Sequence, residues 1–292
     1  MAKLEPNADY RGRLAPSPTG LFHAGHARTF MAAFVRARAH RGTLALRWDD
    51  LDGPRCRPEF VQAGIEDLHW LGINWDEGDD CGGPYSPYRQ SKRIPLYAAA
   101  LEQLRKAGLI YPCICTRKDI ASAVGAPHVE NEEPIYPGTC RNRSISVPDA
   151  AMVTWRFRVQ DGRQVMFEDG RMGAQCFGCG RDFGDFVVWR SGNVPSYQLA
   201  CVVDDAAMRI TEVVRGADLL TSTARQILLQ EALGLVSPRY FHCPLVLDVN
   251  GRRLAKRHDS LSIQVLRQNG LTPEAVACWG PVTEGNDLQP SQ

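Results

Sequence analysis

The 292-residue sequence lacks long hydrophobic runs. It contains no stretch of 18 consecutive apolar residues, which excludes a transmembrane helix of ordinary length. Residues 1–10 are polar and lack the apolar segment of an export signal. We therefore expect a cytoplasmic protein without a membrane partner, in which the ten cysteines are thiols or metal ligands rather than disulfides.

The sequence also lacks an excess of charge of one sign. Its 34 basic and 33 acidic residues give a formal net charge of +1. This balance excludes RNA binding through a broad basic surface, so any contact with RNA must come from a local patch. Arginines cluster between residues 28 and 41 and again around Lys256, where they form either such patches or ordinary solvated faces. The hydrophobic content of 44% suffices for one or two domains, and no internal repeat is present.

Two widely separated segments have the residues of an ATP site. The first, residues 11–26, predicts a strand, a loop stiffened by two prolines, and a helix that opens with His23-x-Gly25-His26. Amide groups at a helix start bind anions, and imidazoles donate hydrogen bonds to phosphate oxygens. The second segment surrounds Lys256, whose ammonium can meet the same phosphates from the other side.

Four ordered segments resemble the glutamyl group of the class I aminoacyl-tRNA synthetases. They are RLAPSPTGLFHAGH at residues 13–26, RWDDLDGPR at 47–55, VDD at 203–205 followed by TEVVRGADL at 211–219, and LAKRH at 254–258. The last stands where that class has its KMSKS loop and keeps the middle lysine. The matches cover most of the chain, and their order also agrees with that of the family.

Length separates the branches of this family. Only 34 residues follow His258, whereas a domain needs roughly 50 residues or more to bury a core. We therefore expect no anticodon-binding domain, and the chain resembles the short glutamyl-Q tRNA(Asp) synthetases. The resemblance implies an α/β fold, with a Rossmann-like class I synthetase catalytic core and an inserted zinc-containing acceptor-type subdomain.

The same resemblance implies a reaction and its partners. Members of this branch activate glutamate with ATP without needing tRNA for that step, and then transfer it to queuosine at the wobble position of tRNA(Asp). We expect a monomer. Two alternatives stay open: a ligase that acts on another acceptor, such as a carrier protein or a small amine, and a non-catalytic RNA-binding paralogue. The presence of His23, His26 and Lys256 argues against the second alternative.

Site residues follow from the resemblance, position by position. His23, His26 and Lys256 would be catalytic and would contact ATP together with Gly25, with Mg²⁺ accompanying the nucleotide. The glutamate site would consist of Arg13, Leu14, Ala15, Pro16, Ser17, Asp49, Tyr197 and Arg215. Asp49 departs from the family, which has glutamate there. The reach of the carboxylate falls by about 1.5 Å, so a water or a shifted strand would have to compensate. For Arg215 the alternative is a surface salt bridge.

Cysteines suggest a metal site. Cys113 and Cys115 lie two residues apart, and a third cysteine, Cys140, follows a Pro-Gly turn, so their thiolates can reach one tetrahedral Zn²⁺. The resemblance adds Tyr136, at the family's Y-x₃-C spacing from Cys140. The alternative is a pair of buried thiols on a strand. A further pair, Cys176 and Cys179, predicts either free thiols or a contribution to the first site.

The order of patterns along the chain predicts its organisation. We expect the first half of the catalytic domain at 1–112, the zinc-binding and tRNA-facing insertion at 113–185, the second half at 186–250, and the KMSKS-like loop with a helical tail at 251–292. Expected strands are 11–14, 43–48 and 197–205, and expected helices are 58–71, 85–108 and 221–233.

Overall fold

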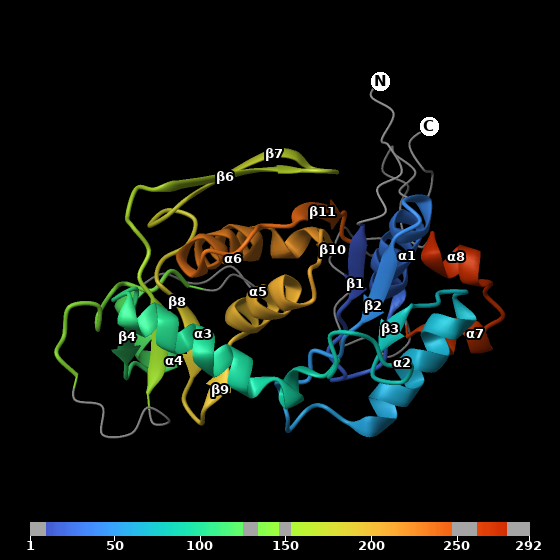
Figure 1. The fold of residues 1–292 in the computed structure, drawn as a ribbon, viewed down its shortest axis with the longest axis horizontal. Helices are drawn as coiled ribbons and strands as arrows, with labels where there is room; N and C mark the ends of the chain where they lie inside the picture. The colour runs from blue at the N-terminus through green and yellow to red at the C-terminus, as the bar shows by residue number, and fades with distance from the viewer. Residues whose placement is uncertain (1–9, 125–133, 146–152, 247–261, 279–292) are drawn as a thin grey trace.

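The computed structural model describes residues 10–124, 134–145, 153–246 and 262–278 (Figure 1). The strands are β1 (Arg11–Leu14), β2 (Thr43–Leu46), β3 (Glu77–Gly78), β4 (Ile110–Cys113), β5 (Thr154–Phe157), β6 (Gln164–Asp169), β7 (Gly173–Gly178), β8 (Phe186–Arg190), β9 (Val194–Pro195), β10 (Glu212–Gly216) and β11 (Arg239–Cys243). The helices are α1 (Ala24–Ala39), α2 (Pro58–Trp70), α3 (Ile94–Lys106), α4 (Arg117–Val124), α5 (Tyr197–Ala207), α6 (Leu220–Leu233), α7 (Ile263–Gln268) and α8 (Pro273–Ala277), with 3₁₀ turns at Gln90–Lys92 and Ala217–Leu219.

Parallel strands form the centre of the catalytic part. β1 pairs with β2 in parallel, β2 with β3, and β10 with β11. The backbone N–H of Thr211 donates to the carbonyl of Arg11 at 2.9 Å, so β10 follows directly beside β1, as Figure 1 shows. This order, β3-β2-β1-β10-β11, brings the carboxyl ends of β1, β2 and β10 to one edge, where open α/β sheets bind ligands. The predicted strands at 11–14 and 43–48 are confirmed, the second ending at Leu46.

Other strands form a second sheet. β4, β5, β8 and β9 pair antiparallel in that order, while the β6–β7 hairpin joins β11 through Asp169 and Tyr240. β5 of this sheet lies in the expected insertion at 113–185, whereas β8 follows it and β4 begins before it. The sheet therefore combines strands from the insertion and from both expected halves of the catalytic domain. The division of the chain into four parts stays a prediction.

Helix ends follow local sequence signals. α2 begins at Pro58 and ends before Gly72, and α6 ends at Gly234; both glycines have positive φ, as expected for helix C-termini. Residues 85–93 do not belong to α3, which begins at Ile94 after the 3₁₀ turn, so the helix expected from 85 was predicted too long. Leu96 of α3 is an exposed apolar residue.

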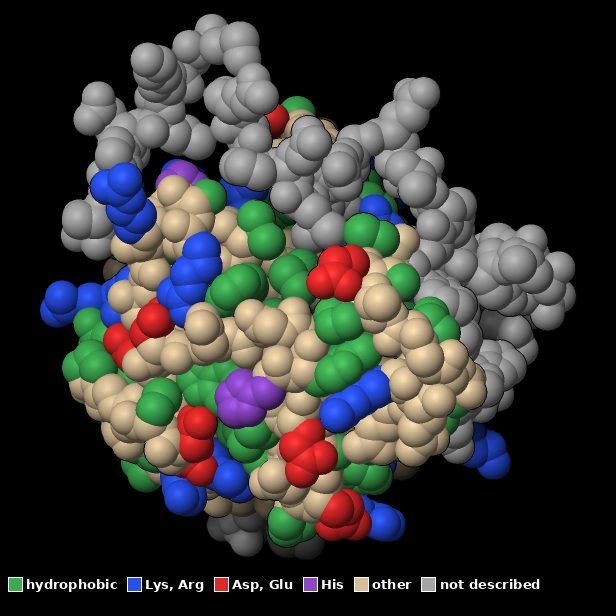
Figure 2. Space-filling view, turned by 90° about the vertical axis from the view of Figure 1, so that its right-hand side faces the viewer, with side chains coloured by type: hydrophobic (Ala, Val, Ile, Leu, Met, Phe, Trp, Pro, Cys, Tyr) green, Lys and Arg blue, Asp and Glu red, His purple; other side chains and the backbone are tan. Residues whose placement is uncertain are grey.

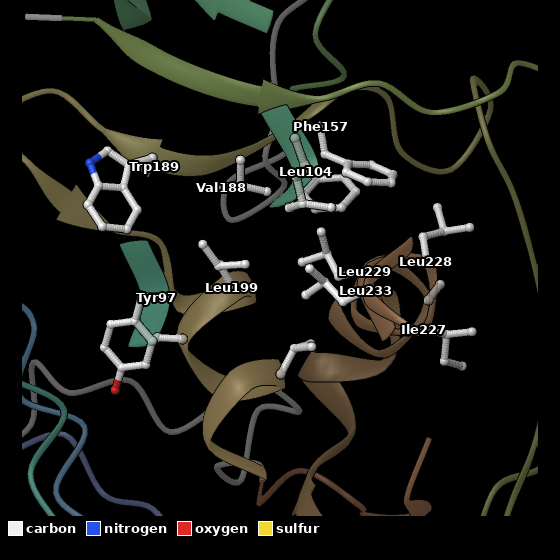
Figure 3. Packing of buried hydrophobic residues seen from close by; sticks show 14 of the residues in the cluster. Tyr97, Leu104, Phe157, Val188, Trp189, Leu199, Ile227, Leu228, Leu229 and Leu233 are labelled. Carbon is white, nitrogen blue, oxygen red and sulfur yellow. The ribbon is translucent and has the colours of Figure 1, made fainter. Parts of the chain in front are cut away.

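The strand expected at 197–205 is wrong, because these residues form helix α5. The side chain of Ser196 caps the helix by accepting the N–H of Leu199. The periodicity of apolar residues cannot distinguish a buried helix from a buried strand when the apolar run is short. Most residues of this run are buried, so its apolar residues do not mark a single face. Figure 3 shows Leu199 of α5 and Leu229 of α6 pointing towards the same core as Val188 of β8. Asp204 and Asp205 consequently lie inside the protein instead of at a strand end.

The surface agrees with the near-neutral composition. Among the described residues of the face that carries α7 and α8, basic and acidic side chains are interspersed, and neither sign forms a broad patch (Figure 2). Among the described residues, no helix combines the length and apolar character needed to cross a membrane.

Gly64 in α2 provides a test of the packing behind residues 23–26, which we call the histidine tetrad. A Cβ at this position would come within 2.8 Å of Phe22 Cζ and 2.9 Å of Trp48 Cη2. We expect Gly64→Ala to lower the free energy of unfolding by about 1 kcal/mol, because overpacking outweighs the usual helix preference for alanine. Urea unfolding measures this change. Gly53→Ala is the control, since no described atom lies within 4 Å of its Cβ position; a stabilised Gly64→Ala variant would contradict the packing.

Candidate active site

The histidine tetrad forms the start of α1, as predicted. His23 is the N-cap residue, and its Nδ1 accepts the N–H of Gly25 at 3.1 Å. The Nδ1 of His26 accepts the N–H of His23 at 3.2 Å, which completes a reciprocal cap. A neutral imidazole that accepts at Nδ1 carries its proton on Nε2. Both rings therefore have an Nε2–H donor beside the positive end of a helix, an arrangement suited to an anion.

Lys256 lies outside the described residues, as does the rest of the KMSKS-like segment. Residues on either side of that segment lie close to residues 23–26. Ser262 forms a backbone bridge with His23, and the Cγ2 of Val246 lies 4.0 Å from the position of a Cβ at Gly25. The role expected for Lys256 stays a prediction.

A buried charge network lies at the carboxyl end of β2. Arg47 is fully buried, and it donates from Nε to Asp49 and from Nη1 to Asp205, each at 2.7 Å. Its Nε also lies 3.7 Å from a carboxylate oxygen of Asp204. One guanidinium therefore lies beside three carboxylates. A charged side chain that is removed from water is stable only when oppositely charged groups and hydrogen bonds replace its hydration.

Asp204 has further partners that share the charge. It accepts hydrogen bonds from Arg93 Nε at 2.6 Å, Tyr97 OH at 2.8 Å and Gln90 Nε2 at 2.9 Å. These partners come from α3 and the turn before it, whereas Arg47 follows β2. The network thus fixes α5, α3 and the end of β2 relative to one another.

Asp49 combines burial with access to a cavity. Burial raises the pKa of its carboxyl to about 6, although the neighbouring Arg47 opposes this rise. The carboxyl is therefore ionised at neutral pH and gains a proton in mildly acidic solution. Asp49 lines a cavity of about 830 Å³ together with Ser17 and Tyr197. The cavity has the size of a small-molecule site, roughly 300–1,000 Å³.

The predicted arginines lie behind this cavity. Arg13 and Arg215 are both buried, so Arg215 forms no surface salt bridge. Arg13 donates from Nη1 to the carbonyl of Val214 at 3.0 Å, and its Nε lies 3.5 Å from Asp205. Arg215 donates from Nη1 to the hydroxyl of Tyr197 at 3.2 Å. Neither arginine lines the cavity itself: Arg215 is connected to it through Tyr197, and Arg13 through Asp205 and the charge network that contains Asp49.

The loop at residues 14–16 is held by its backbone. The carbonyl of Leu14 accepts the N–H of Arg47 at 2.8 Å, and that of Pro16 accepts the N–H of Asp49 at 2.9 Å. Ala15 lies between them, and Ser17 follows at the cavity wall. Of the residues expected in the glutamate site, Ser17, Asp49 and Tyr197 line the cavity. The others lie in the elements behind it, and the roles of all of them stay predictions.

The expected metal ligands form one cluster. The Sγ atoms of Cys113, Cys115 and Cys140 lie within 4.8 Å of one another, with 3.5 Å between Cys115 and Cys140. The hydroxyl of Tyr136 lies 3.4 Å from Cys113 Sγ and 3.5 Å from Cys115 Sγ. Sulfur atoms that share a tetrahedral metal at 2.3 Å lie about 3.8 Å apart. The four side chains therefore fit one tetrahedral ion.

Arg156 provides positive charge beside this cluster. Its Nε donates to Cys113 Sγ at 3.3 Å, and its guanidinium lies 3.9 Å from the centre of the Tyr136 ring. A guanidinium here offsets the negative charge of several thiolates. Cys176 and Cys179 lie on or next to β7 and belong to no group of three metal-binding side chains among the described residues, which agrees with the prediction of free thiols.

Sequence reasoning missed several residues of the site. Arg47, Asp204 and Asp205 lie inside the matched motifs but received no role, although R-x-D and D-D are charge patterns that burial would force to pair. Arg156 and His242, whose Nε2 accepts a hydrogen bond from Arg215, lie outside those motifs, and no local pattern marks them.

Cys115→Ser tests the metal cluster. We expect the purified protein to hold one metal ion per chain and this variant to lose it, because a hydroxyl replaces one thiolate ligand. Elemental analysis and the midpoint of thermal unfolding measure the two effects. Cys176→Ser is the matched control, since Cys176 lies outside the cluster. A Cys115→Ser protein with its full metal content would contradict the ligand set.

Known proteins match this chain over most of its length. Glutamyl-Q tRNA(Asp) synthetase of Nitratidesulfovibrio vulgaris is 49% identical over 266 residues, which cover 89% of this chain and 82% of that protein. The protein of the same name from Symbiobacterium thermophilum is 46% identical over 271 residues, with 91% and 83% covered.

A solved structure also matches this chain over most of its length. The glutamate tRNA ligase of Elizabethkingia meningosepticum, crystallised in complex with its amino acid, superposes with a TM-score of 0.78 at 29% identity. The superposition covers 92% of this chain and 60% of that ligase, so the chain spans about three fifths of the larger protein. The family model for the catalytic domain of class I tRNA synthetases (E and Q) matches residues 9–279. The chain therefore belongs to the class I tRNA synthetases of this group.

Proposed function

We propose that the protein activates glutamate with ATP and transfers the glutamyl group to queuosine at the wobble position of tRNA(Asp). One observation carries this proposal: the chain is 49% identical over 266 residues to a protein named Glutamyl-Q tRNA(Asp) synthetase. The site chemistry supports it, because Asp49, Ser17 and Tyr197 line a cavity, Arg215 donates to Tyr197, and the helix start at His23 is suited to an anion.

In the first step a carboxylate oxygen of glutamate attacks the α-phosphorus of ATP, and pyrophosphate leaves. Both reactants carry their own reactive groups, so the protein contributes positioning and charge stabilisation. The Nε2–H groups of His23 and His26 donate to phosphate oxygens, and Gly25 leaves room for the adenosine. Lys256 stabilises the charge that develops on the phosphates, and Mg²⁺ accompanies ATP as part of the substrate. In the second step a nucleophilic group of the queuosine base attacks the acyl carbon, and AMP leaves.

Glutamate carries two carboxylates and one ammonium. Arg13 and Arg215 offer guanidinium donors to the carboxylates, and Tyr197 and Ser17 add hydroxyls at the cavity wall. The ionised carboxylate of Asp49 faces the ammonium, while the loop at residues 14–16 supplies backbone groups. Asp49 replaces the longer glutamate of the family, and its bond to Arg47 fixes the orientation of the shorter side chain.

We further propose that Cys113, Cys115, Tyr136 and Cys140 hold one structural Zn²⁺. Three thiolates suit zinc, and a phenol becomes a ligand only when the ion polarises or ionises it. The bound ion would fix the loop around Tyr136, which with Cys115 lines the same cavity as Tyr197. ATP and tRNA as substrates agree with the cytoplasmic site of action expected from the sequence.

Two assays test the proposed reaction. We expect ATP–pyrophosphate exchange that depends on glutamate and proceeds without tRNA, followed by transfer of labelled glutamate to tRNA(Asp) that contains queuosine. The control is tRNA(Asp) with guanosine in place of queuosine, which should stay unlabelled. Exchange without transfer would indicate another acceptor. No exchange with any amino acid would contradict an enzymatic function.

The pKa of Asp49 gives a pH dependence. Below a pKa of about 6 the carboxyl gains a proton and loses the charge that attracts the ammonium. We expect the KM for glutamate in the exchange reaction to rise about tenfold between pH 7 and pH 5. Asp49→Asn should have a high KM at both pH values. Asp50→Asn is the matched control, because Asp50 bonds to Ser91 instead, and it should keep the rise. A KM that is independent of pH in the wild-type protein would contradict this role.

A further inference from the structure

Arg215 makes three hydrogen bonds inside the protein. Besides the bond to Tyr197, its Nη2 donates to the hydroxyl of Thr223 at 2.6 Å, and its Nε donates to Nε2 of His242 at 3.3 Å. Thr223 and His242 also contact each other at 2.9 Å. Both are fully buried, and they come from α6 and β11. Arg215 on β10 is therefore held by two elements besides its own.

Asp169 fixes the ring of His242. The Nδ1 of His242 lies 2.6 Å from one carboxylate oxygen of Asp169, and the other oxygen accepts the backbone N–H of His242 at 3.1 Å. The second oxygen also accepts the N–H groups of Arg171 and Met172, at 3.0 and 2.8 Å. Asp169 therefore cannot turn away, and its hydrogen bond keeps the histidine proton on Nδ1.

The tautomer decides whether His242 can hold Arg215. With the proton on Nδ1, Nε2 is an acceptor, and its lone pair is shared by the hydroxyl of Thr223 and the Nε–H of Arg215. Burial, helped by the nearby Arg215, lowers the pKa of His242, although Asp169 acts in the opposite direction. The ring is therefore neutral and accepting at neutral pH. In a protonated ring, the Nε2–H of His242 would point at the Nε–H of Arg215, and two donors cannot form a hydrogen bond.

The three bonds leave a defined part of Arg215 for a ligand. A guanidinium has five N–H donors, and those that point from Nε and Nη2 to one side are taken by His242 and Thr223. One N–H of Nη1 is donated to Tyr197. Of the five donors, one on Nη1 and one on Nη2 then have no hydrogen bond to a described residue. Such a pair matches the two oxygens of a carboxylate.

We propose that His242, oriented by Asp169 and joined by Thr223, is a positioning residue that fixes the Arg215 guanidinium for one carboxylate of the amino-acid substrate. This inference rests on the proposed function. Asp169 lies at the end of β6, so hydrogen bonds through His242 connect the β6–β7 hairpin to Arg215. His242 itself touches no substrate in this arrangement.

Substitution of His242 tests the proposal in the glutamate-dependent exchange assay. We expect His242→Leu to raise the KM for glutamate at least about tenfold, because Arg215 loses its acceptor, while the KM for ATP changes by less than about twofold. His242→Gln offers an amide oxygen near the position of Nε2 and should return the KM for glutamate to within about threefold of wild type.

Asp169→Asn provides a second, independent variant. The asparagine amide can donate to Nδ1, which would move the histidine proton to Nε2 and set it against the N–H of Arg215. We expect the KM for glutamate to rise as in His242→Leu. Combining Asp169→Asn with His242→Gln should remove most of this effect, because glutamine has no tautomer to reverse.

Tyr10→Phe is the control for lost stability alone. Its buried hydroxyl donates to Glu212 at 2.8 Å, at the opposite end of β10 from Arg215. We expect a lower unfolding midpoint with an unchanged KM for glutamate. The proposal is overturned if His242→Leu has a normal KM for glutamate, or if both KM values rise together. A wild-type protein without glutamate-dependent exchange would instead overturn the proposed function, and this inference with it.

Discussion

The buried guanidinium of Arg47 is the interaction on which the site depends. It joins Asp49 at the end of β2 to Asp205 on α5, and Asp204 extends the network to Arg93 and α3. Removing one member of such a group leaves a buried charge without its partner, at a cost of about 3–5 kcal/mol. The network therefore fixes the position of Asp49 and of the C-terminal part of α5 at the same time. Any ligand site between them takes its shape from this network.

The parallel sheet places the remaining groups around this centre. β1, β2 and β10 end at one edge, so the loop after β1, Asp49 after β2 and Arg215 on β10 reach one region. The tetrad begins α1 directly after the β1 loop. Residues that lie far apart in the sequence thus meet because parallel strands end together, and the buried network sets their distances.

Much of the fold could be predicted from local signals. The ends of α2 and α6 follow from a proline and from glycines with positive φ, and the histidine tetrad forms the helix start that its pattern indicates. The cysteine spacing also predicted a cluster that the structure assembles. These features depend on residues close in sequence, where chain geometry leaves few alternatives.

The errors concern tertiary surroundings. The run from Tyr197 to Asp205 is a largely buried helix, and an apolar run of this length does not by itself distinguish a buried helix from a buried strand. The pairing of Asp169 with His242 joins residues 73 positions apart, each an ordinary residue in its own segment. The sheet that contains β4 and β8 likewise depends on pairing between distant strands. Such contacts are decided by packing, which no local pattern encodes.

The central claim is that the cavity beside Asp49 and Tyr197 binds glutamate between a carboxylate and fixed arginines. A crystal structure of the protein with glutamate tests this claim most directly. We predict density for the amino acid in this cavity, with its ammonium next to Asp49 and one carboxylate on the two remaining N–H groups of Arg215. Glutamate bound elsewhere, or with its ammonium turned towards Arg215, would contradict the account.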